Sequence, residues 1–97
     1  MKIKEIEIDG NKFQGFEGEI APGTNLVFIK GSKGFIMCGY LNMDTADKFN
    51  NIAAIAVGVK CIDDMLNTKI VKVSAAAKNF GINEGMPVKE ALLKLNC

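Results

Sequence analysis

A cysteine followed by a glycine lies in the most hydrophobic segment of this sequence. Residues 34–41 have the composition of a buried strand that holds Cys38 and Gly39, and the polar residues 42–45 are typical of a helix start. Thiols beside a helix N-terminus ionise more readily, and the thiolate is the nucleophilic form. The pattern therefore predicts Cys38 as a candidate catalytic nucleophile.

A second segment of the same kind follows. Residues 54–60 are apolar with Gly58 near their end, and residues 61–66 again favour a short helix. If residues 35–59 form a strand–helix–strand unit, the two strand ends lie side by side, and N–H groups of both helices point toward one cleft. Such a cleft favours a small anionic or carbonyl-bearing ligand. The ligand-binding residues that it predicts are Gly39, Asn42, Gly58, Lys60 and Asp63.

Both segments also have a purely structural interpretation. Free cysteine is among the most buried residue types, and the apolar run around Cys38 favours a core position for it. Gly39 and Gly58 fit tight packing of a helix on a sheet, or a bulge, as well as they fit a ligand that approaches the backbone. Asp63 fits the first turn of a helix, where acidic residues interact favourably with the helix dipole.

Several residue types that catalysis commonly uses are absent. The sequence has no histidine, no arginine and no tryptophan. Without histidine there is no Cys–His dyad, no Ser–His–Asp triad and no zinc site of the usual kind. Without arginine there is no bidentate recognition of phosphate or carboxylate. We therefore expect neither a metal nor a cofactor, and whether the chain is an enzyme stays open on the sequence.

Charge and hydropathy exclude other classes. The formal net charge is +1, and no basic stripe with interleaved aromatic residues supports nucleic-acid binding. No apolar run approaches the ~20 residues that a membrane span needs. The three cysteines are odd in number and far apart in the sequence, at positions 38, 61 and 97. They are interpreted as reduced thiols, and a cytoplasmic location is expected.

Strand signals fill the first third of the chain. Alternation over residues 4–8, the turn Asp9-Gly10-Asn11 and a partner strand over 12–20 predict a hairpin. Further strands are expected over 25–29 and 35–40, separated by a glycine-bearing turn. Phe13 and Phe16 fall on opposite faces of the second strand, and Ile3 is out of phase with the first.

Helices and short strands alternate in the remainder. Helices are expected from Asp44 to about residue 50, over 61–66, over 74–80 and from Pro87 to about residue 95. A strand is expected over 52–59, and residues 70–73 fit either a short strand or the lead-in to the helix that follows. The fold class is α+β: N-terminal antiparallel strands, then a strand–helix–strand unit, then C-terminal helices. We expect a single domain, residues 1–97, with a β-rich assembly region over 1–34 and an α/β portion over 35–97.

Apolar residues on both faces of the N-terminal strands predict self-association. Phe13 lies on one face, and Phe16 and Ile20 lie on the other. A domain of this size can cover one face of such a sheet, and an uncovered face or edge promotes contact with another copy. We expect a homo-oligomer, dimer or tetramer, built through these strands.

The chain resembles the YunC-like family of small bacterial and archaeal proteins of unknown function. The resemblance rests on residues 35–41, which include Met-Cys-Gly at 37–39, and on residues 56–66, 81–86 and 90–92. It implies an α+β domain whose N-terminal β region mediates tetramer assembly, and it implies no activity. The family often has threonine where this chain has Cys61, which suggests that Cys61 is not a required thiol.

Three functional hypotheses remain at this point. The first is a homo-oligomeric binding or scaffold module with a small-ligand cleft. The second is a thiol-dependent enzyme with Cys38 as its nucleophile, and Lys60 or Asn42 nearby. The third is a redox or metabolite sensor. The first leads because no complete catalytic set is visible in the sequence.

Overall fold

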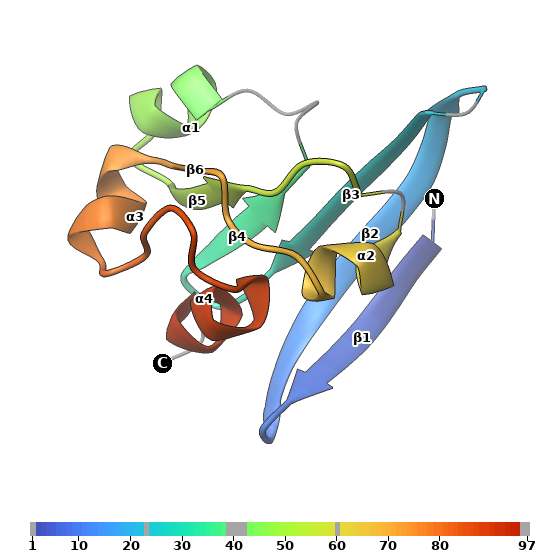
Figure 1. Cartoon of the computed structure of the whole chain (residues 1–97), viewed down its shortest axis with the longest axis horizontal. Helices are drawn as coiled ribbons and strands as arrows, with labels where there is room; N and C mark the ends of the chain where they lie inside the picture. The colour runs from blue at the N-terminus through green and yellow to red at the C-terminus, as the bar shows by residue number, and fades with distance from the viewer. Residues whose placement is uncertain (1, 23, 39–42, 60, 96–97) are drawn as a thin grey trace.

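Six strands of the described residues form one sheet, and they follow one another across it in chain order (Figure 1). The computed structural model describes residues 2–22, 24–38, 43–59 and 61–95. All neighbouring strands pair antiparallel except β4 and β5, which are parallel. The strands are β1 (Lys2–Ile8), β2 (Asn11–Ala21), β3 (Thr24–Lys30), β4 (Gly34–Met37), β5 (Ile52–Ile55) and β6 (Lys72–Val73).

The turn between β1 and β2 lies where the sequence predicts a hairpin, but it is one residue shorter, because Asn11 already belongs to β2. Asp9 and Gly10 have positive φ angles of 50° and 81°, and Ile8 pairs with Asn11 directly across the turn. Two consecutive positive φ angles match the twist of the flanking strands, and Asp-Gly tolerates them well. The turn fixes the register of β1 on β2, and thereby which side chains share a face.

The strand–helix–strand unit is β4, α1 (Met43–Lys48) and β5. Gly34 begins β4 close against β5, where a Cβ would overlap the carbonyl oxygen of Ile52. Both strands are shorter than predicted: β4 ends at Met37 and β5 at Ile55. The chain leaves the extended conformation after β5, since Gly58 has φ of +74°. The predicted end of β4, at residue 40, falls outside the described residues.

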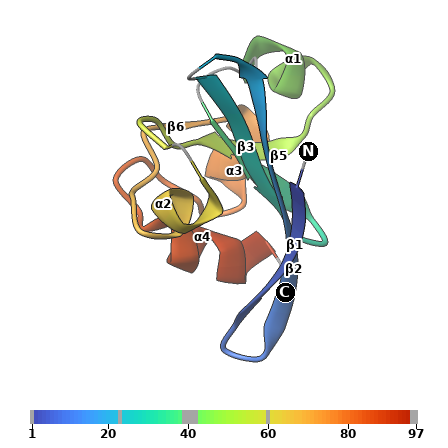
Figure 2. The same ribbon diagram turned by 90° about the vertical axis from the view of Figure 1, so that its right-hand side faces the viewer.

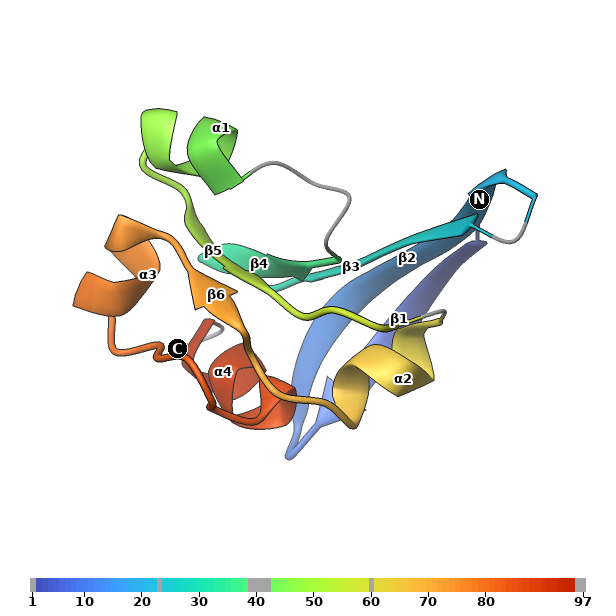
Figure 3. The same ribbon diagram turned by 45° about the horizontal axis from the view of Figure 1, so that its top comes forward.

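Three helices cover one face of the sheet, and α1 lies on the other face (Figure 3). The covering helices are α2 (Ile62–Leu66), α3 (Ala75–Asn79) and α4 (Val88–Leu95), which Figure 2 shows on the same side of the strands. The main core lies beneath them. The face of α4 that the sequence predicts to be apolar is fully buried there, through Val88, Ala91, Leu92 and Leu95.

One buried hydroxyl joins β5 to α3. Ser74 is fully buried, and its Oγ accepts hydrogen bonds from the backbone N–H groups of Ala53 and Ala77, both at 3.1 Å. The same hydroxyl donates to the carbonyl oxygen of Asn51 at 2.7 Å. Ser74 is therefore the N-cap of α3 and not its first helical residue, and α3 ends before Gly81, whose φ is +99°.

The other face of the sheet carries a smaller core. Met37, Ala53 and Ile55 are buried there, with Phe28 and Phe35 packed against them. The helix α1 lies beside this cluster, over β5, and none of the described helices covers the N-terminal strands β1–β3 on this side (Figure 3). The observed fold is thus the predicted α+β class. No helix among the described residues is long and apolar enough to cross a membrane.

Candidate functional site

The Cys38 thiol is buried in the main core. The residue follows β4, its backbone N–H donates to the carbonyl oxygen of Val27 at 3.0 Å, and the side chain is 3% exposed. Neighbours in the same cluster include Ile36, Ala54 and Ala56. A nucleophile must be reached by its substrate, so this burial favours the structural interpretation of Cys38. Its role as a catalytic residue stays a prediction.

The strand ends that should form the cleft do lie side by side. Met37 pairs with Ile55 in the parallel ladder, and the N–H of Ala56 donates to the carbonyl oxygen of Met37 at 2.9 Å. Cys38 and Gly58 therefore follow neighbouring strands, as predicted. Three of the predicted site residues, Gly39, Asn42 and Lys60, lie outside the described residues.

Gly58 is needed for its backbone conformation. The sequence left open whether this glycine serves close packing, a bulge or the approach of a ligand. A Cβ at this position would meet no atom within 4 Å, so close packing does not require glycine here. The φ angle of +74° at Gly58 favours glycine, because residues with a Cβ rarely adopt that conformation. The residue is exposed, and its backbone turns the chain from β5 toward α2.

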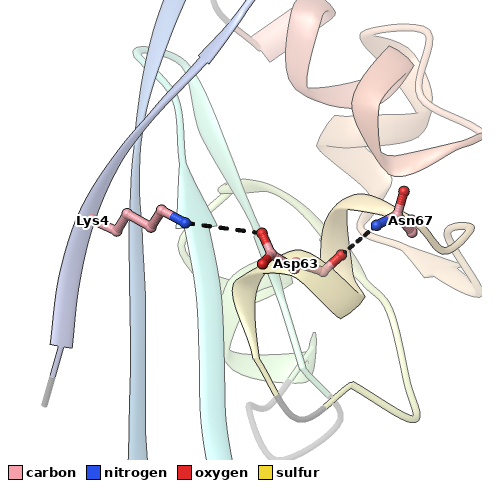
Figure 4. Close-up of polar contacts among 3 residues, drawn as sticks. All are labelled: Lys4, Asp63 and Asn67. Atoms are coloured by element: carbon pink, nitrogen blue, oxygen red, sulfur yellow. Dashed lines mark hydrogen bonds and ion pairs between the residues drawn. The ribbon is translucent and has the colours of Figure 1, made fainter.

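Asp63 lies in the first turn of α2 and contacts β1 (Figure 4). Its carboxylate is 3.9 Å from the Nζ of Lys4, and its backbone carbonyl accepts a hydrogen bond from the Asn67 amide at 2.9 Å. The Asp63 side chain is 75% exposed, so solvent screens the ion pair, and such pairs contribute roughly 0–1 kcal/mol. Its predicted role in ligand binding stays a prediction.

Metal binding finds no support in the described part of the chain, where no three His, Cys, Asp or Glu residues are grouped closely enough to hold an ion. The remaining described thiol, Cys61, is half-buried and precedes α2 as its N-cap, without a capping side-chain hydrogen bond. Cys97 lies outside the described residues.

The side of β1–β3 that none of the described helices covers is called the open face. We define it by Ile3, Glu5, Gln14, Phe16, Phe28 and Lys30. The Phe16 and Phe28 rings stack with their centroids 4.4 Å apart and their planes 18° apart, and Ile3 beside them is 61% exposed. A hollow on this face is lined by Ile3, Glu5, Gln14 and Lys30 among others.

Sequence reasoning found Phe16 but not its partners. Ile3, which is out of phase with the first predicted strand, pairs with Phe16 in an unbroken register. It is out of phase with Ile6 and Ile8 because it belongs to the opposite face. The position of Ile3 in the alternation of β1 was thus the signal for a row of apolar side chains on the second face of the sheet. Ile20, the other residue expected on this face, is a β2 residue whose side chain is not described.

Comparison with known proteins gives a consistent family and fold. The model of the family "Domain of unknown function (DUF1805)" matches residues 37–95. The uncharacterised protein YunC of Bacillus subtilis (strain 168) is 33% identical over 99 residues, which cover 98% of this chain and 97% of that protein. The crystal structure of a protein of unknown function, TA1206 from Thermoplasma acidophilum, has a TM-score of 0.92 and 45% identity, covering 98% of this chain and 92% of that one.

Proposed function

This chain belongs to the DUF1805 family, and we propose that it works as a homo-oligomeric binding module that assembles through the open face of β1–β3. The observation that carries the proposal is the stacked pair Phe16–Phe28 with Ile3 beside it, on a face that none of the described helices covers. Contiguous exposed apolar surface of this kind marks interaction sites in soluble proteins.

The edge of the sheet is a poorer surface for assembly than its face. If β1 pairs antiparallel with β1 of another copy about a two-fold axis, even-numbered residues lie opposite even-numbered ones and odd-numbered residues opposite odd-numbered ones. The reason is that directly opposed residues point to the same side of the sheet. Every such register over residues 2–8 places like charges opposite each other. A register centred on Lys4 or on Glu5 sets that residue against the same residue of the other copy. A register centred on Ile6 sets Glu5 against Glu7 of the other copy. Like charges directly opposite are destabilising.

The expected affinity is low. Burying an exposed Ile or Phe side chain contributes roughly 1.5–3 kcal/mol, and Phe16 and Phe28 are already half-buried within the subunit. Association costs an estimated ~4–15 kcal/mol. The gain from three apolar residues of each copy is of the same order as that cost, so we expect a weak assembly that dissociates on dilution.

The test is sedimentation velocity over a range of micromolar concentrations. We expect the parent to form dimers or tetramers, and Phe16→Asp to shift toward monomer, because it places an unpaired charge in a desolvated contact. Val71→Asp is the matched control: Val71 is 47% exposed but lies beside β6, at the far edge of the sheet. A parent that sediments only as the 10.5 kDa species would contradict the proposal.

The binding role of the module rests on the cleft predicted at the ends of β4 and β5. The pairing of Met37 with Ile55 supports it by bringing the two strand ends together. The small anionic or carbonyl-bearing ligand, and a cytoplasmic location, remain part of this proposal. The thiol enzyme, and a redox sensor that uses Cys38, receive less support because both need an accessible thiol and the Cys38 side chain is buried.

A further inference from the structure

The hollow on the open face forms where β2 extends beyond the end of β3. The strand β2 begins three residues before its first pair with β3, which joins Gln14 to Lys30. Residues 11–13 therefore pair with β1 and not with β3. Beyond Lys30 the chain turns, and the turn residues Gly31 and Ser32 form one wall of the hollow. Its volume of about 480 Å³ lies within the roughly 300–1,000 Å³ of typical small-molecule sites.

The turn that forms this wall is fixed to the helix on the other side of the sheet. The N–H of Lys33 and the hydroxyl of Ser32 both donate to the carbonyl oxygen of Leu95 in α4, at 2.9 and 3.3 Å. Gly31 lies close against the same residue, since a Cβ there would come within 3.2 Å of that oxygen. The wall is therefore formed before any ligand arrives, and a preorganised site loses less conformational freedom on binding.

Three polar side chains cross the hollow in one row. Glu5 on β1 lies opposite Gln14 on β2, and Gln14 lies opposite Lys30 on β3. The row therefore runs from a carboxylate through an amide to an ammonium group. Neighbouring strands are about 4.8 Å apart, so the Glu5 and Lys30 side chains leave the sheet roughly 10 Å from each other.

The two charged ends of the row do not neutralise each other. The Glu5 carboxylate lies 3.6 Å from the Nζ of Lys12, and both side chains are about two-thirds exposed, at 68% and 69%. Lys30 is exposed and makes no ion pair with any described residue. Exposed pairs such as Glu5–Lys12 are weak, so Glu5 can exchange that partner for another cation at little cost.

We propose that the hollow binds a dipeptide in its zwitterionic form, with the ammonium group at Glu5, the peptide bond at Gln14 and the carboxylate at Lys30. A dipeptide carries these three groups in the order that complements the row, and two extended residues span about 7 Å. The Glu5 and Lys30 side chains cover the remaining distance to its two ends. The Gln14 amide both donates and accepts hydrogen bonds, as a peptide bond does. Ile3, which also lines the hollow, offers an apolar contact to a side chain of the ligand.

Smaller ligands use only part of the row. A free amino acid carries both charges on one carbon atom, so it is too short to bridge Glu5 and Lys30. A simple carboxylate pairs with Lys30 and brings no cation to Glu5. The site lies apart from the cleft predicted at the ends of β4 and β5. It goes beyond the proposed assembly, because all the residues that form it belong to one subunit.

A chemical-shift titration with glycyl-leucine tests the site. In protein labelled with a heavy nitrogen isotope, we expect the backbone amide signals of residues 12–14 and 30–32 to move most. The contacts are exposed, so we expect a dissociation constant on the order of millimolar. Acetyl-glycyl-leucine lacks the ammonium group and glycyl-leucinamide lacks the carboxylate. Each should bind about two- to fivefold more weakly, which is the effect of losing one exposed ion pair.

Two variants assign the ends of the ligand. Lys30→Gln should weaken the binding of glycyl-leucine about two- to fivefold and leave that of glycyl-leucinamide unchanged, because the amide has no carboxylate to lose. Glu5→Gln should weaken glycyl-leucine similarly and leave acetyl-glycyl-leucine unchanged. Lys89→Gln and Glu90→Gln are the matched controls. Both residues are exposed on α4, on the opposite side of the sheet, and their replacement should change none of these affinities.

Two results would overturn the proposal. One is the absence of shifts at residues 12–14 and 30–32 at ligand concentrations well above millimolar. The other is a set of shifts that the blocked dipeptides and the Glu5 and Lys30 variants leave unchanged, which would indicate nonspecific contact. The protein concentration is held fixed, because self-association through the open face changes access to the hollow. A parent that sediments as a monomer but shows the expected shifts would contradict the assembly and support the site.

Discussion

Replacing Ser74 with alanine tests the account of how β5 and α3 are held together. The hydroxyl is fully buried and makes three hydrogen bonds: it accepts from Ala53 and Ala77 and donates to Asn51. Alanine has nearly the same volume, so the change removes these bonds without leaving a large cavity. The loss of polar contacts therefore dominates the effect.

The magnitude follows from which groups stay buried. The N–H groups of Ala53 and Ala77 are left in buried surroundings without this acceptor, and each such group costs roughly 1–3 kcal/mol. The carbonyl of Asn51 is partly accessible, so water can replace its lost donor at little cost. We expect Ser74→Ala to lower the free energy of unfolding by about 2–6 kcal/mol, out of a typical total of roughly 5–15 kcal/mol.

The assay is urea denaturation followed by circular dichroism, at one fixed protein concentration because self-association adds to apparent stability. Ser32→Ala is the matched control. Its hydroxyl donates to the carbonyl of Leu95 at 3.3 Å from an exposed turn, and its loss should cost under about 1 kcal/mol. If Ser74→Ala unfolds at the same midpoint as the parent, the buried hydroxyl does not hold the β5–α3 junction, and the reasoning is refuted.

Two further predictions concern the core. Leu92→Ala should lower stability by roughly 2–5 kcal/mol, the range for truncating a fully buried leucine, and an unchanged denaturation midpoint would mean that α4 is not packed as described. In the native state, iodoacetamide should modify the half-buried Cys61 before the buried Cys38, as followed by peptide mass mapping, because burial limits access to the thiol. Rapid native labelling of Cys38 would instead support the thiol-enzyme hypothesis.

Local signals determined the parts of the fold that the sequence predicted well. Asp9-Gly10 has the residue types that a tight hairpin needs, and the spacing of Val88, Ala91, Leu92 and Leu95 marks one helix face. Both features depend only on residues that are close together in the sequence, so they can be predicted without knowledge of the tertiary structure.

Long-range contacts determined what the sequence did not reveal. The role of Ser74 depends on Ala53 and Asn51, which lie 21 and 23 residues earlier in the chain. The stacking of Phe16 on Phe28 depends on the register of β2 with β3, and hydropathy alone does not fix that register. The pairing of β4 with β5 agrees with the predicted strand–helix–strand unit, and the burial of Cys38 agrees with the core position that its apolar neighbours favoured, whereas the predicted cleft stays a prediction.

The most direct test of the central claim is an isotope-filtered NOE experiment on a mixture of labelled and unlabelled chains. Ile3 and Phe28 lie two strands apart within one subunit, on β1 and β3, which is nearly 10 Å of sheet. The account predicts NOEs from the Ile3 methyl groups of the labelled chain to the Phe16 or Phe28 ring of the unlabelled partner. An assembled protein whose Ile3 methyl groups show NOEs only within their own chain would contradict assembly through the open face.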